Sequence, residues 1–408
     1  MSDVVSSSVP ELRFPEFSEE WARARLGDFM SFKNGVNAQR DAYGDGAKFI
    51  NVMDIIRSEP ITYQNIIGRV EVSESDFIKN EVKYGDILFQ RSSETREEVG
   101  QSNIYLDDIN SAVFGGFVIR GRPIKQFDPR FFNALLKTQR VRKDMTSRSG
   151  GSTRFNIGQD SLSAVEVNVP PKVAEQQKIA GFIEAVSKKL TLFMENRAAM
   201  EDYKRGLMQQ LFSQTLRFTR NDGTAFPDWE GKRLGKVFVE RSERGNEGAE
   251  LLSVTMDRGV VRAVDVDRAN GASADRSNYK TVYVNDIAYN SMRMWQGANG
   301  VSSYFGIVSP AYTVITPNKG EIPAFWGYYF KLTKVIREFQ RYSQGLTSDT
   351  WNLKFPALSS LKLPVPHPEE QQKIADALSA IDAKIDALNS KITQLETFKK
   401  GLLQKMFV

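Results

Sequence analysis

The side chains that most often carry chemistry are scarce in this sequence. It has no cysteine and only one histidine, His367, among 408 residues. Disulfides, thiol nucleophiles, cysteine-ligated zinc and iron–sulfur clusters are therefore excluded, and so is any reaction that needs two imidazoles. His367 stands between two prolines, where we expect a turn residue rather than a general base. No metal site is predicted.

One short segment, PDWEGK at residues 227–232, has the residue types of a nuclease site. In restriction-type nucleases the PD and E-x-K elements lie on different strands, so that carboxylates and a lysine converge on Mg²⁺. Here the two elements are nearly contiguous. The corresponding segment earlier in the chain, FPEFSEEW at residues 14–21, lacks the lysine. We therefore interpret both segments as structural.

Methyltransferase and nucleotide-binding motifs are incomplete. NVPP at residues 168–171 resembles a distorted N-P-P-Y amino-group clamp, but it has an inserted valine and no aromatic residue, and its counterpart LPVP at residues 363–366 has no asparagine. VFGGF at residues 113–117 contributes two glycines and nothing more, and no G-x-x-x-x-G-K-[ST] segment occurs. We predict no catalytic residue in this chain, so the protein is not expected to be an enzyme.

Basic and polar segments that can contact DNA occur at matching places in the two halves. Residues 137–154, KTQRVRKDMTSRSGGSTR, contain six Lys or Arg and one Asp, and RYSQGLTSDT follows at residues 341–350. QRSSETRE at residues 90–97 corresponds to NSMRMWQGANG at residues 290–300. Guanidinium, amide and hydroxyl groups suit phosphates and base edges, although a solvated loop explains any single residue equally well. The DNA-binding candidates are Arg91, Ser92, Arg96, Arg148, Ser149, Gly150, Gly151, Ser152, Arg154, Arg293, Trp295, Gln296, Asn299, Arg341, Gln344, Thr347 and Ser348.

These segments are carried by a chain that repeats itself. Residues 175–213 align without a gap on residues 370–408, with 14 identities in 39 positions. Weaker matches precede both copies, whereas residues 33–75 and 241–279 do not align. At roughly 100–200 residues per domain, the length predicts two to four domains. The two halves therefore share a frame and differ in what the frame carries.

The repeated segments predict two long helices. Apolar residues recur at alternating steps of four and three, as in a coiled coil, and 39 residues make a helix of about 58 Å. Neither helix can bury its seam alone, so we predict that the two pack against each other, antiparallel. The predicted packing residues are Ile179, Ile183, Val186, Leu190, Phe193, Met200 and Leu207 in the first helix, and Ile374, Leu378, Ile381, Ile385, Leu388, Ile392 and Leu395 in the second.

The predicted fold class is α/β (α+β), with two similar mixed bodies joined by these helices. Residues 1–170 and 216–366 form the bodies, and residues 171–215 and 367–408 form the helices. β-rich runs are ITYQNIIGRVEV, SAVFGGFVIR and KTVYVNDIAYN, at residues 61–72, 111–120 and 280–290. One amphipathic helix per half is expected near residues 131–145 and 325–342. The strand order is not predicted.

The whole layout resembles the specificity subunit of type I restriction-modification enzymes. The resemblance is carried by GDIL at residues 85–88, by EQQKIA at Glu175 and Glu370, by the K-[RK]-G-L-[ML]-Q segments that start at Lys204 and Lys399, and by FPDW…RLG at residues 226–235. One departure is YVNDIAYN at residues 283–290, which lacks the glycine of GDIL, and this weakens the strand assignment there.

The resemblance implies a non-catalytic subunit with two target-recognition domains. Each would read one part of a bipartite, asymmetric target in double-stranded DNA. It implies two modification subunits that carry S-adenosylmethionine, and restriction subunits that use ATP and Mg²⁺ for translocation and cleavage. The exposed faces and the first residues of the long helices are expected to bind these partners. The helices are expected to act as a ruler that sets the gap between the two parts of the target.

Other features agree with this expectation without proving it. The net charge of +5 suits a polyanionic partner. The first residues show no secretion signal, and no apolar run reaches the length of a membrane span, so a cytoplasmic location is expected. Two alternatives remain open: a duplicated coiled-coil adaptor without DNA contact, and a methyltransferase that works alone.

Overall fold

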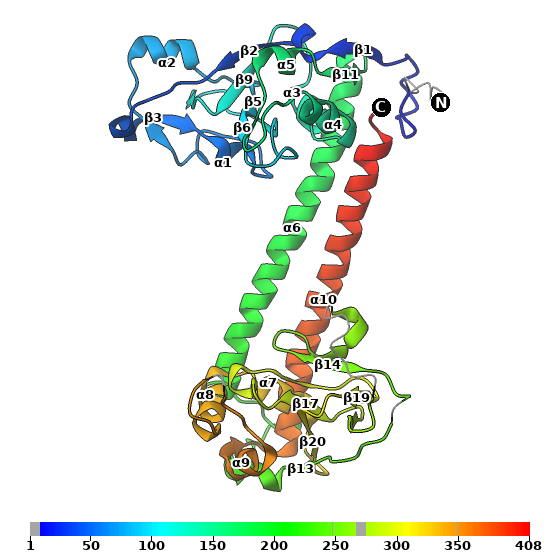
Figure 1. Ribbon diagram of the computed structural model, residues 1–408. Coiled ribbons are helices and arrows are strands. Elements are labelled where there is room, and N and C mark those ends of the chain that lie inside the picture. The colour runs from blue at the N-terminus through cyan, green and yellow to red at the C-terminus, as the bar shows by residue number, and fades with distance from the viewer. Residues whose placement is uncertain (1–8, 247, 267–274, 349) are drawn as a thin grey trace. The chain divides into compact units, whose positions relative to one another are not determined.

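Two long helices, α6 (Val173–Phe212) and α10 (Pro368–Lys405), dominate this computed structural model, which describes residues 9–246, 248–266, 275–348 and 350–408. The chain divides into two compact units. Unit 1 contains the described residues up to Glu195 together with Ser390–Val408, and unit 2 contains those of Asn196–Asn389. Each long helix thus contributes one part to unit 1 and the other part to unit 2 (Figure 1).

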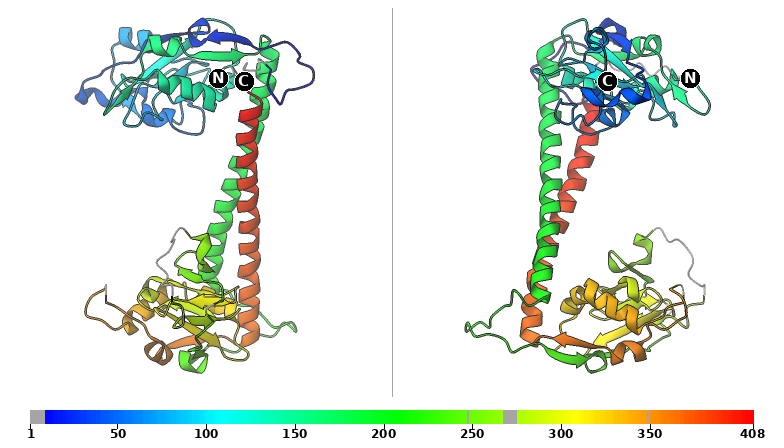
Figure 2. Two further views of the ribbon diagram at one scale, coloured as in Figure 1. Left: turned by 45° about the vertical axis from the view of Figure 1, so that its right-hand side comes forward. Right: turned by 90° about the vertical axis from the view of Figure 1, so that its left-hand side faces the viewer.

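Both predicted long helices are present. Pro368 is the first residue of α10, where its missing N–H costs nothing. In unit 1, Ile179 and Ile183 of α6 share one core with Leu402 and Met406 of α10. The start of α6 therefore packs against the end of α10, as an antiparallel pair requires; both views of Figure 2 show these turns side by side, in green and red.

The predicted packing between the two long helices is confirmed in both units. All fourteen predicted packing residues are buried or half-buried. In unit 2 the end of α6 joins the start of α10, with Leu211 and Phe212 in the same core as Ile374 and Leu378. In unit 2 a polar residue of α6 also pairs with α10, since Lys204 Nζ donates to Asp382 Oδ1 at 2.6 Å.

The body of unit 1 is built on a four-stranded antiparallel sheet in the order β2-β9-β5-β7. A separate pair, β1 and β11, leads into α6, and β3 carries a smaller sheet with β4 and β8. The elements of this body are β1 (Ala22–Arg25), β2 (Met30–Asn34), β3 (Tyr43–Ile50), α1 (Val52–Ile55), β4 (Arg69–Val70), α2 (Glu74–Asn80), β5 (Ile87–Gln90), β6 (Ser92–Ser93), β7 (Ser102–Ile104), β8 (Val113–Phe114), β9 (Val118–Pro123), α3 (Pro129–Leu135), α4 (Gln139–Ser147), β10 (Phe155–Asn156), α5 (Gln159–Ser163) and β11 (Glu166–Val169).

The body of unit 2 repeats this plan. Its four-stranded antiparallel sheet has the order β13-β20-β17-β18, and the pair of β12 and β21 leads into α10. The elements are β12 (Glu230–Arg233), β13 (Phe238–Glu240), β14 (Leu252–Thr255), β15 (Gly259–Arg262), β16 (Lys280–Val282), β17 (Ile287–Asn290), β18 (Asn299–Val301), β19 (Gly306–Val308), β20 (Tyr312–Pro317), α7 (Pro323–Tyr329), α8 (Thr333–Tyr342), α9 (Phe355–Ser360) and β21 (Lys362–Val365).

Each central strand separates two cores, because successive side chains of a strand point to opposite faces of the sheet. Ile87 and Phe89 of β5 face the core that includes the long helices, whereas Leu88 faces a second core under β3 and β8. β17 has the same alternation, with Ile287 and Tyr289 toward the helices and Ala288 on the other side. One sheet face thus fixes each body to the helices.

The lost glycine of the second half does not disrupt its strand. Gly85 and Asn285 occupy equivalent turns and both have left-handed backbones, with φ of +87° and +72°. Asparagine tolerates this conformation better than other residues with a side chain. The next residue closes each turn alike, because Asp86 Oδ2 accepts from the Lys83 N–H and Asp286 Oδ2 from the Tyr283 N–H, both at 2.9 Å.

Two local predictions were wrong. Each expected amphipathic helix is two helices, α3 and α4 in unit 1 and α7 and α8 in unit 2. The chain breaks because Thr138 and Leu332, which precede α4 and α8, adopt extended backbones. The run at residues 61–72 is mostly irregular, with one isolated bridge at Ile61 and the two residues of β4.

The EQQ segments at the start of both long helices fasten the helices to the bodies. Glu175 Oε1 and Oε2 accept from Arg13 Nε and Nη2 at 2.7 and 2.9 Å. Glu370 makes the same pair with Arg217, at 3.0 and 2.9 Å. The adjacent Gln176 accepts from the Asp128 N–H at the start of α3, as Gln371 does from the Ile322 N–H at the start of α7. These Glu and Gln side chains are buried, so the shared motif is structural.

Glu175→Ala is expected to lower the free energy of unfolding by about 3 kcal/mol, because it leaves a largely buried guanidinium without its carboxylate. The side chains of Arg13 and Glu175 are 9% and 2% exposed. Glu166→Gln is the control, since its pair with Arg23 is exposed, and it should leave stability unchanged. Urea unfolding of the full chain measures both. Equal stability of the two variants would contradict a structural role for Glu175.

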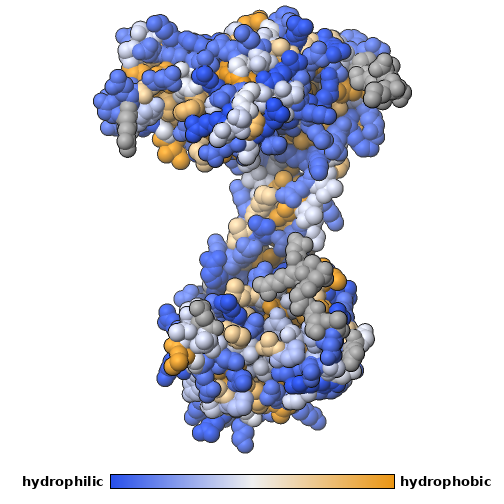
Figure 3. All heavy atoms as spheres, viewed as in Figure 1, coloured by the Kyte–Doolittle hydropathy of each residue, from blue (hydrophilic) through white to orange (hydrophobic). Residues whose placement is uncertain are grey.

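None of the helices in the described part of the chain is long and apolar enough to cross a membrane. The face in Figure 3 is largely hydrophilic, with apolar side chains in small separate patches.

Candidate DNA interface

In unit 1 the two segments predicted to contact DNA are brought together. We call residues 91–99 and 148–156 the unit 1 loop pair. β6 and β10 pair antiparallel, with Ser93 opposite Phe155 and Ser92 opposite Asn156, and the Ser92 hydroxyl donates to the Asn156 side chain. The guanidinium of Arg96 lies 5.6 Å from the centre of the Phe155 ring. Two loops that lie far apart in the sequence therefore form one surface.

The second segment of this pair folds back on itself. Gly150 and Asn156 exchange two backbone hydrogen bonds at 2.9 and 2.8 Å. Gly151, inside the resulting turn, has φ of +124°, and a Cβ there would lie 1.9 Å from the Arg154 carbonyl oxygen. Glycine is thus required at this position by geometry, and the segment forms a defined turn.

Unit 2 has an equivalent arrangement with different side chains. Its loop pair consists of residues 291–298 and 343–352, of which Asp349 lies outside the described residues. Gln344 and Asn352 exchange backbone hydrogen bonds at 3.0 and 2.8 Å, and the Leu353 N–H donates to the Ser291 carbonyl at 2.8 Å. Trp295 packs edge-on against Trp351, with ring centres 5.1 Å apart. This contact replaces that between Arg96 and Phe155.

The candidates divide by exposure. The prediction that Ser149 and Asn299 contact DNA was wrong. Asn299 is fully buried and donates to the Gly297 carbonyl at 3.2 Å, and Ser149 is buried at the end of α4 with its hydroxyl on the Thr146 carbonyl. Neither side chain can reach DNA in this structure. The candidates that are exposed or half-exposed on the loop pairs or at the ends of the helices that precede them are Arg91, Ser92, Arg96, Arg148, Gly150, Gly151, Ser152, Arg154, Arg293, Trp295, Gln296, Arg341, Gln344, Thr347 and Ser348.

The basic segment before the first loop is less available than its composition suggests. Arg142 Nη2 donates to the carbonyls of Glu97 and Val99 at 2.8 and 2.7 Å, and burial lowers the pKa of its guanidinium. Arg148 pairs with Asp144 at 2.9 Å, and Arg140 donates to the Val408 carbonyl. Arg142 therefore holds the first loop in place instead of offering its charge to a phosphate.

The corresponding cations of unit 2 are also engaged. Lys331 donates to the carbonyls of Met256 and Gly297, and Lys334 to that of Phe212. Arg341 Nη1 donates to both carboxylate oxygens of Glu338, at 2.8 and 3.0 Å, but its side chain stays exposed. Arg293 is exposed and donates to Gln296 at 3.2 Å, so an amide and a guanidinium are presented together. Such groups can hydrogen-bond the edges of bases.

Two apolar residues beside the unit 1 loop pair were missed by the sequence analysis. Met53 and Phe117 are each 63% exposed and line two adjacent surface pockets, one of which also includes Ser92 and Arg154. Gly115 and Gly116 precede Phe117 and lie close against other residues, since Cβ atoms there would meet Phe49 at 2.6 Å and Asn37 at 1.7 Å. The two glycines of VFGGF thus allow a close approach of the backbone beside Phe117. Three exposed glutamates, Glu94, Glu97 and Glu98, temper the positive charge of this surface.

PDWEGK and His367 have structural contacts. Arg217 Nη2 donates to the Pro227 carbonyl of PDWEGK at 2.6 Å, and the buried Phe226 ring lies 6.0 Å from that of His367. His367 Nδ1 accepts from the Glu369 N–H at the start of α10, which agrees with a turn residue.

The two units thus have similar bodies that carry different loop pairs. The chain belongs to the type I restriction modification DNA specificity domain family, whose profile matches residues 18–199 and 270–397, more than half of its length.

Individual relatives agree with this assignment. The chain is 24% identical over 414 residues to a Methanocaldococcus jannaschii protein with the provisional name type I restriction enzyme MjaX specificity subunit, covering 95% of this chain and 93% of the relative. It is 27% identical over 191 residues to the type I restriction enzyme HindI specificity subunit of Haemophilus influenzae, covering 44% of this chain and 41% of that protein.

The fold is also that of solved structures. The crystal structure of the type I restriction-modification S subunit from M. genitalium matches with a TM-score of 0.58 at 15% identity, covering 98% of this chain and 99% of that one. A chain from a study of complex assembly and conformational transition in a type I restriction-modification system matches with a TM-score of 0.55, also at 15% identity, covering 96% and 98% of the two chains.

Proposed function

We propose that this chain chooses the DNA sequence for a type I restriction-modification complex, with each unit reading one part of a bipartite, asymmetric target. One observation carries the proposal. The two units share sheet order, helix attachment and loop position, but the side chains on their loop pairs differ. The similar bodies hold the two loop pairs in equivalent positions. Because the side chains of the loop pairs differ, the two parts of the target should differ as well.

The exposed groups suit two kinds of contact. Arg96 and Arg154 in unit 1 can bind phosphates or guanine, and Arg293 with Gln296 in unit 2 can hydrogen-bond base edges. Trp295 offers a flat apolar surface beside them. Phosphate contacts fix the position of a protein on DNA, whereas base contacts supply the sequence information.

The chain makes and breaks no bond itself in this proposal. Adenine methylation, with S-adenosylmethionine, belongs to two modification subunits, and ATP- and Mg²⁺-dependent translocation and cleavage belong to restriction subunits. The support is the family membership together with a sequence that lacks complete catalytic and nucleotide-binding motifs. The Glu and first Gln side chains of the EQQ segments are buried and so cannot contact a partner. The partners are therefore expected to bind exposed faces of α6 and α10, where Leu192, Tyr203 and Phe398 are solvent-accessible.

DNA binding by the complex distinguishes a DNA-recognition subunit from a coiled-coil adaptor without DNA contact. The family match does not support the adaptor. A complex of this chain with modification subunits should bind duplex DNA with log affinity falling linearly in log salt, as counterions are released from contacted phosphates. Titration of a fluorescent duplex at several salt concentrations measures this slope. Absence of binding at low salt would contradict the proposal.

Arg154→Ala is expected to weaken DNA binding by such a complex about tenfold and to reduce the salt slope by about one phosphate contact. Arg154 is exposed on the unit 1 loop pair, and the structure gives its guanidinium no partner among the described residues. Arg140→Ala is the matched control, since Arg140 is bonded to the end of the chain. Equal affinities for the two variants would remove Arg154 from the interface.

A further inference from the structure

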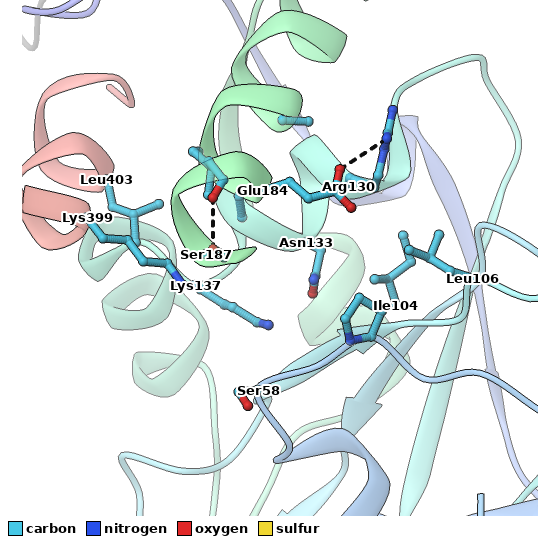
Figure 4. Close-up of a pocket in the computed structure, with 14 residues that line it drawn as sticks. Ser58, Ile104, Leu106, Arg130, Asn133, Lys137, Glu184, Ser187, Lys399 and Leu403 are labelled. Carbon is cyan, nitrogen blue, oxygen red and sulfur yellow. Dashed lines mark hydrogen bonds and ion pairs between the residues drawn. The ribbon is translucent and has the colours of Figure 1, made fainter. Parts of the chain in front are cut away.

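Unit 1 contains a pocket in which two lysines line the same space. The pocket lies where α3 and the short segment after it meet α6 and α10, and its cavity volume is about 170 Å³. Figure 4 shows Lys137 and Lys399 reaching into it, with Asn133 and Ile104 on the opposite wall. Both lysines line this one pocket, and the Lys399 charge contributes to lowering the pKa of Lys137.

In the equivalent place of unit 2, both lysines have partners. Lys204, the counterpart of Lys399, donates to Asp382 Oδ1 at 2.6 Å, and the Tyr328 hydroxyl donates to Asp382 Oδ2 at 2.7 Å. The Lys204 ammonium also lies 5.0 Å from the centre of the Tyr328 ring. Lys331, the counterpart of Lys137, donates to two carbonyl oxygens at 2.7 and 2.8 Å. A carboxylate and an aromatic ring complete this site.

Unit 1 lacks both of these groups. The aligned repeats place Ser187 where unit 2 has Asp382, and Ala134 where it has Tyr328. Neither lysine has a hydrogen bond or ion pair among the residues that the structure describes. Glu184 also lines the pocket, but its carboxylate pairs with Arg130 at 3.3 Å. The pocket therefore has excess positive charge, and smaller side chains stand where unit 2 has an acid and a ring.

Burial alters both lysines. Withdrawal from water lowers the pKa of Lys399, and it lowers the pKa of Lys137 to about 8, with the neighbouring Lys399 charge as a second cause. Lys137 nevertheless keeps an exposed surface. An anion bound there would stabilise both ammonium groups.

We propose that this pocket binds a small aromatic carboxylate, whose acid and ring take the places of the missing Asp and Tyr side chains. The carboxylate would lie between Lys137 and Lys399, and the ring would contact the apolar wall of Ile104, Ala134 and Ile183. A cavity of about 150 Å³ can hold a benzene ring, so the volume is sufficient. Asn133 Oδ1 is buried without a partner and can accept a hydrogen bond from a hydroxyl on the ring.

Isothermal titration calorimetry of the full chain with 4-hydroxyphenylacetate and benzoate tests the proposal. Both should bind, while benzamide, which has the ring without the charge, and inorganic phosphate, which has the charge without the ring, should bind at least tenfold more weakly. Lys399→Met and Lys137→Met should each weaken 4-hydroxyphenylacetate at least tenfold. Lys204→Met, the matched change in unit 2, should leave its binding unchanged.

The double variant Ala134→Tyr with Ser187→Asp grafts the groups of unit 2 into unit 1. It should abolish binding and raise the melting temperature. Binding should also weaken as the pH rises through about 8, because the Lys137 ammonium loses its proton there. The other charged groups that line the pocket are Lys399, Arg130 and Glu184. Absence of binding to the wild-type chain, phosphate binding as tight as 4-hydroxyphenylacetate, or unchanged binding by the graft or by both Met variants would overturn the proposal. DNA recognition does not depend on its outcome.

Discussion

Replacing residues 31–168 by the equivalent region of another specificity subunit is expected to change one half of the methylated target and leave the other half intact. All of the unit 1 loop pair lies inside this region. Arg13, Trp21 and Glu175, which fasten α6 to the body, lie outside it. The exchanged body should therefore dock on an unaltered frame. Sequencing methylated adenines genome-wide, after co-expression with the modification subunit, gives both halves of the target.

The matched control is the reciprocal exchange in unit 2, over residues 241–364, which contain all of its loop pair. It should change the other half of the target and leave the first unaltered. If either exchange changes both halves, the two units do not read independently, and the assignment of one part of the target to each loop pair fails.

Adding one heptad to both long helices is expected to lengthen the unread gap of the target by up to about three base pairs. Seven residues add about 10.5 Å of helix, and they preserve the facing of the seam to within about 20°. One base pair of DNA rises about 3.4 Å. Insertions after Leu192 and after Leu388 suit this design, since the ring of Phe193 and the ammonium of Lys391 are 5.9 Å apart in unit 1.

The control for this experiment replaces exposed residues of the same stretch without changing its length, and its gap should remain that of the wild type. Removing one heptad from each helix should shorten the gap. A methylome in which the longer and shorter chains keep the original gap would contradict the ruler, while it would leave recognition by the two units untouched.

The sequence predicted the long helices because an apolar seam sustained over 39 residues has few other structural solutions. It could not predict the sheet order, since strands as short as β7 or β18 carry too few residues for a pattern. The missing glycine at Asn285 weakened the strand assignment in the second half. In the structure, this asparagine adopts the left-handed backbone that Gly85 adopts in the first half. A lost glycine is therefore weak evidence against a turn.

The candidate interface was predicted at the level of loops and less well at the level of side chains. Composition counts Arg142 as a free charge, but its hydrogen bonds to the carbonyls of Glu97 and Val99 form only in the folded chain. Asn299 was predicted to contact DNA because of its amide group. It is buried in the fold, and burial cannot be predicted from the residue type alone. The pair of Arg13 and Glu175 joins residues 162 positions apart, and no local pattern indicates such a contact.

The most direct test is the map of methylated adenines in a host without other adenine methylation, after co-expression of this chain with its modification subunit. The account predicts one asymmetric motif, with two specific parts, a fixed gap and modification that requires both proteins. A continuous or symmetric motif, or the same methylation when either protein is produced alone, would contradict it.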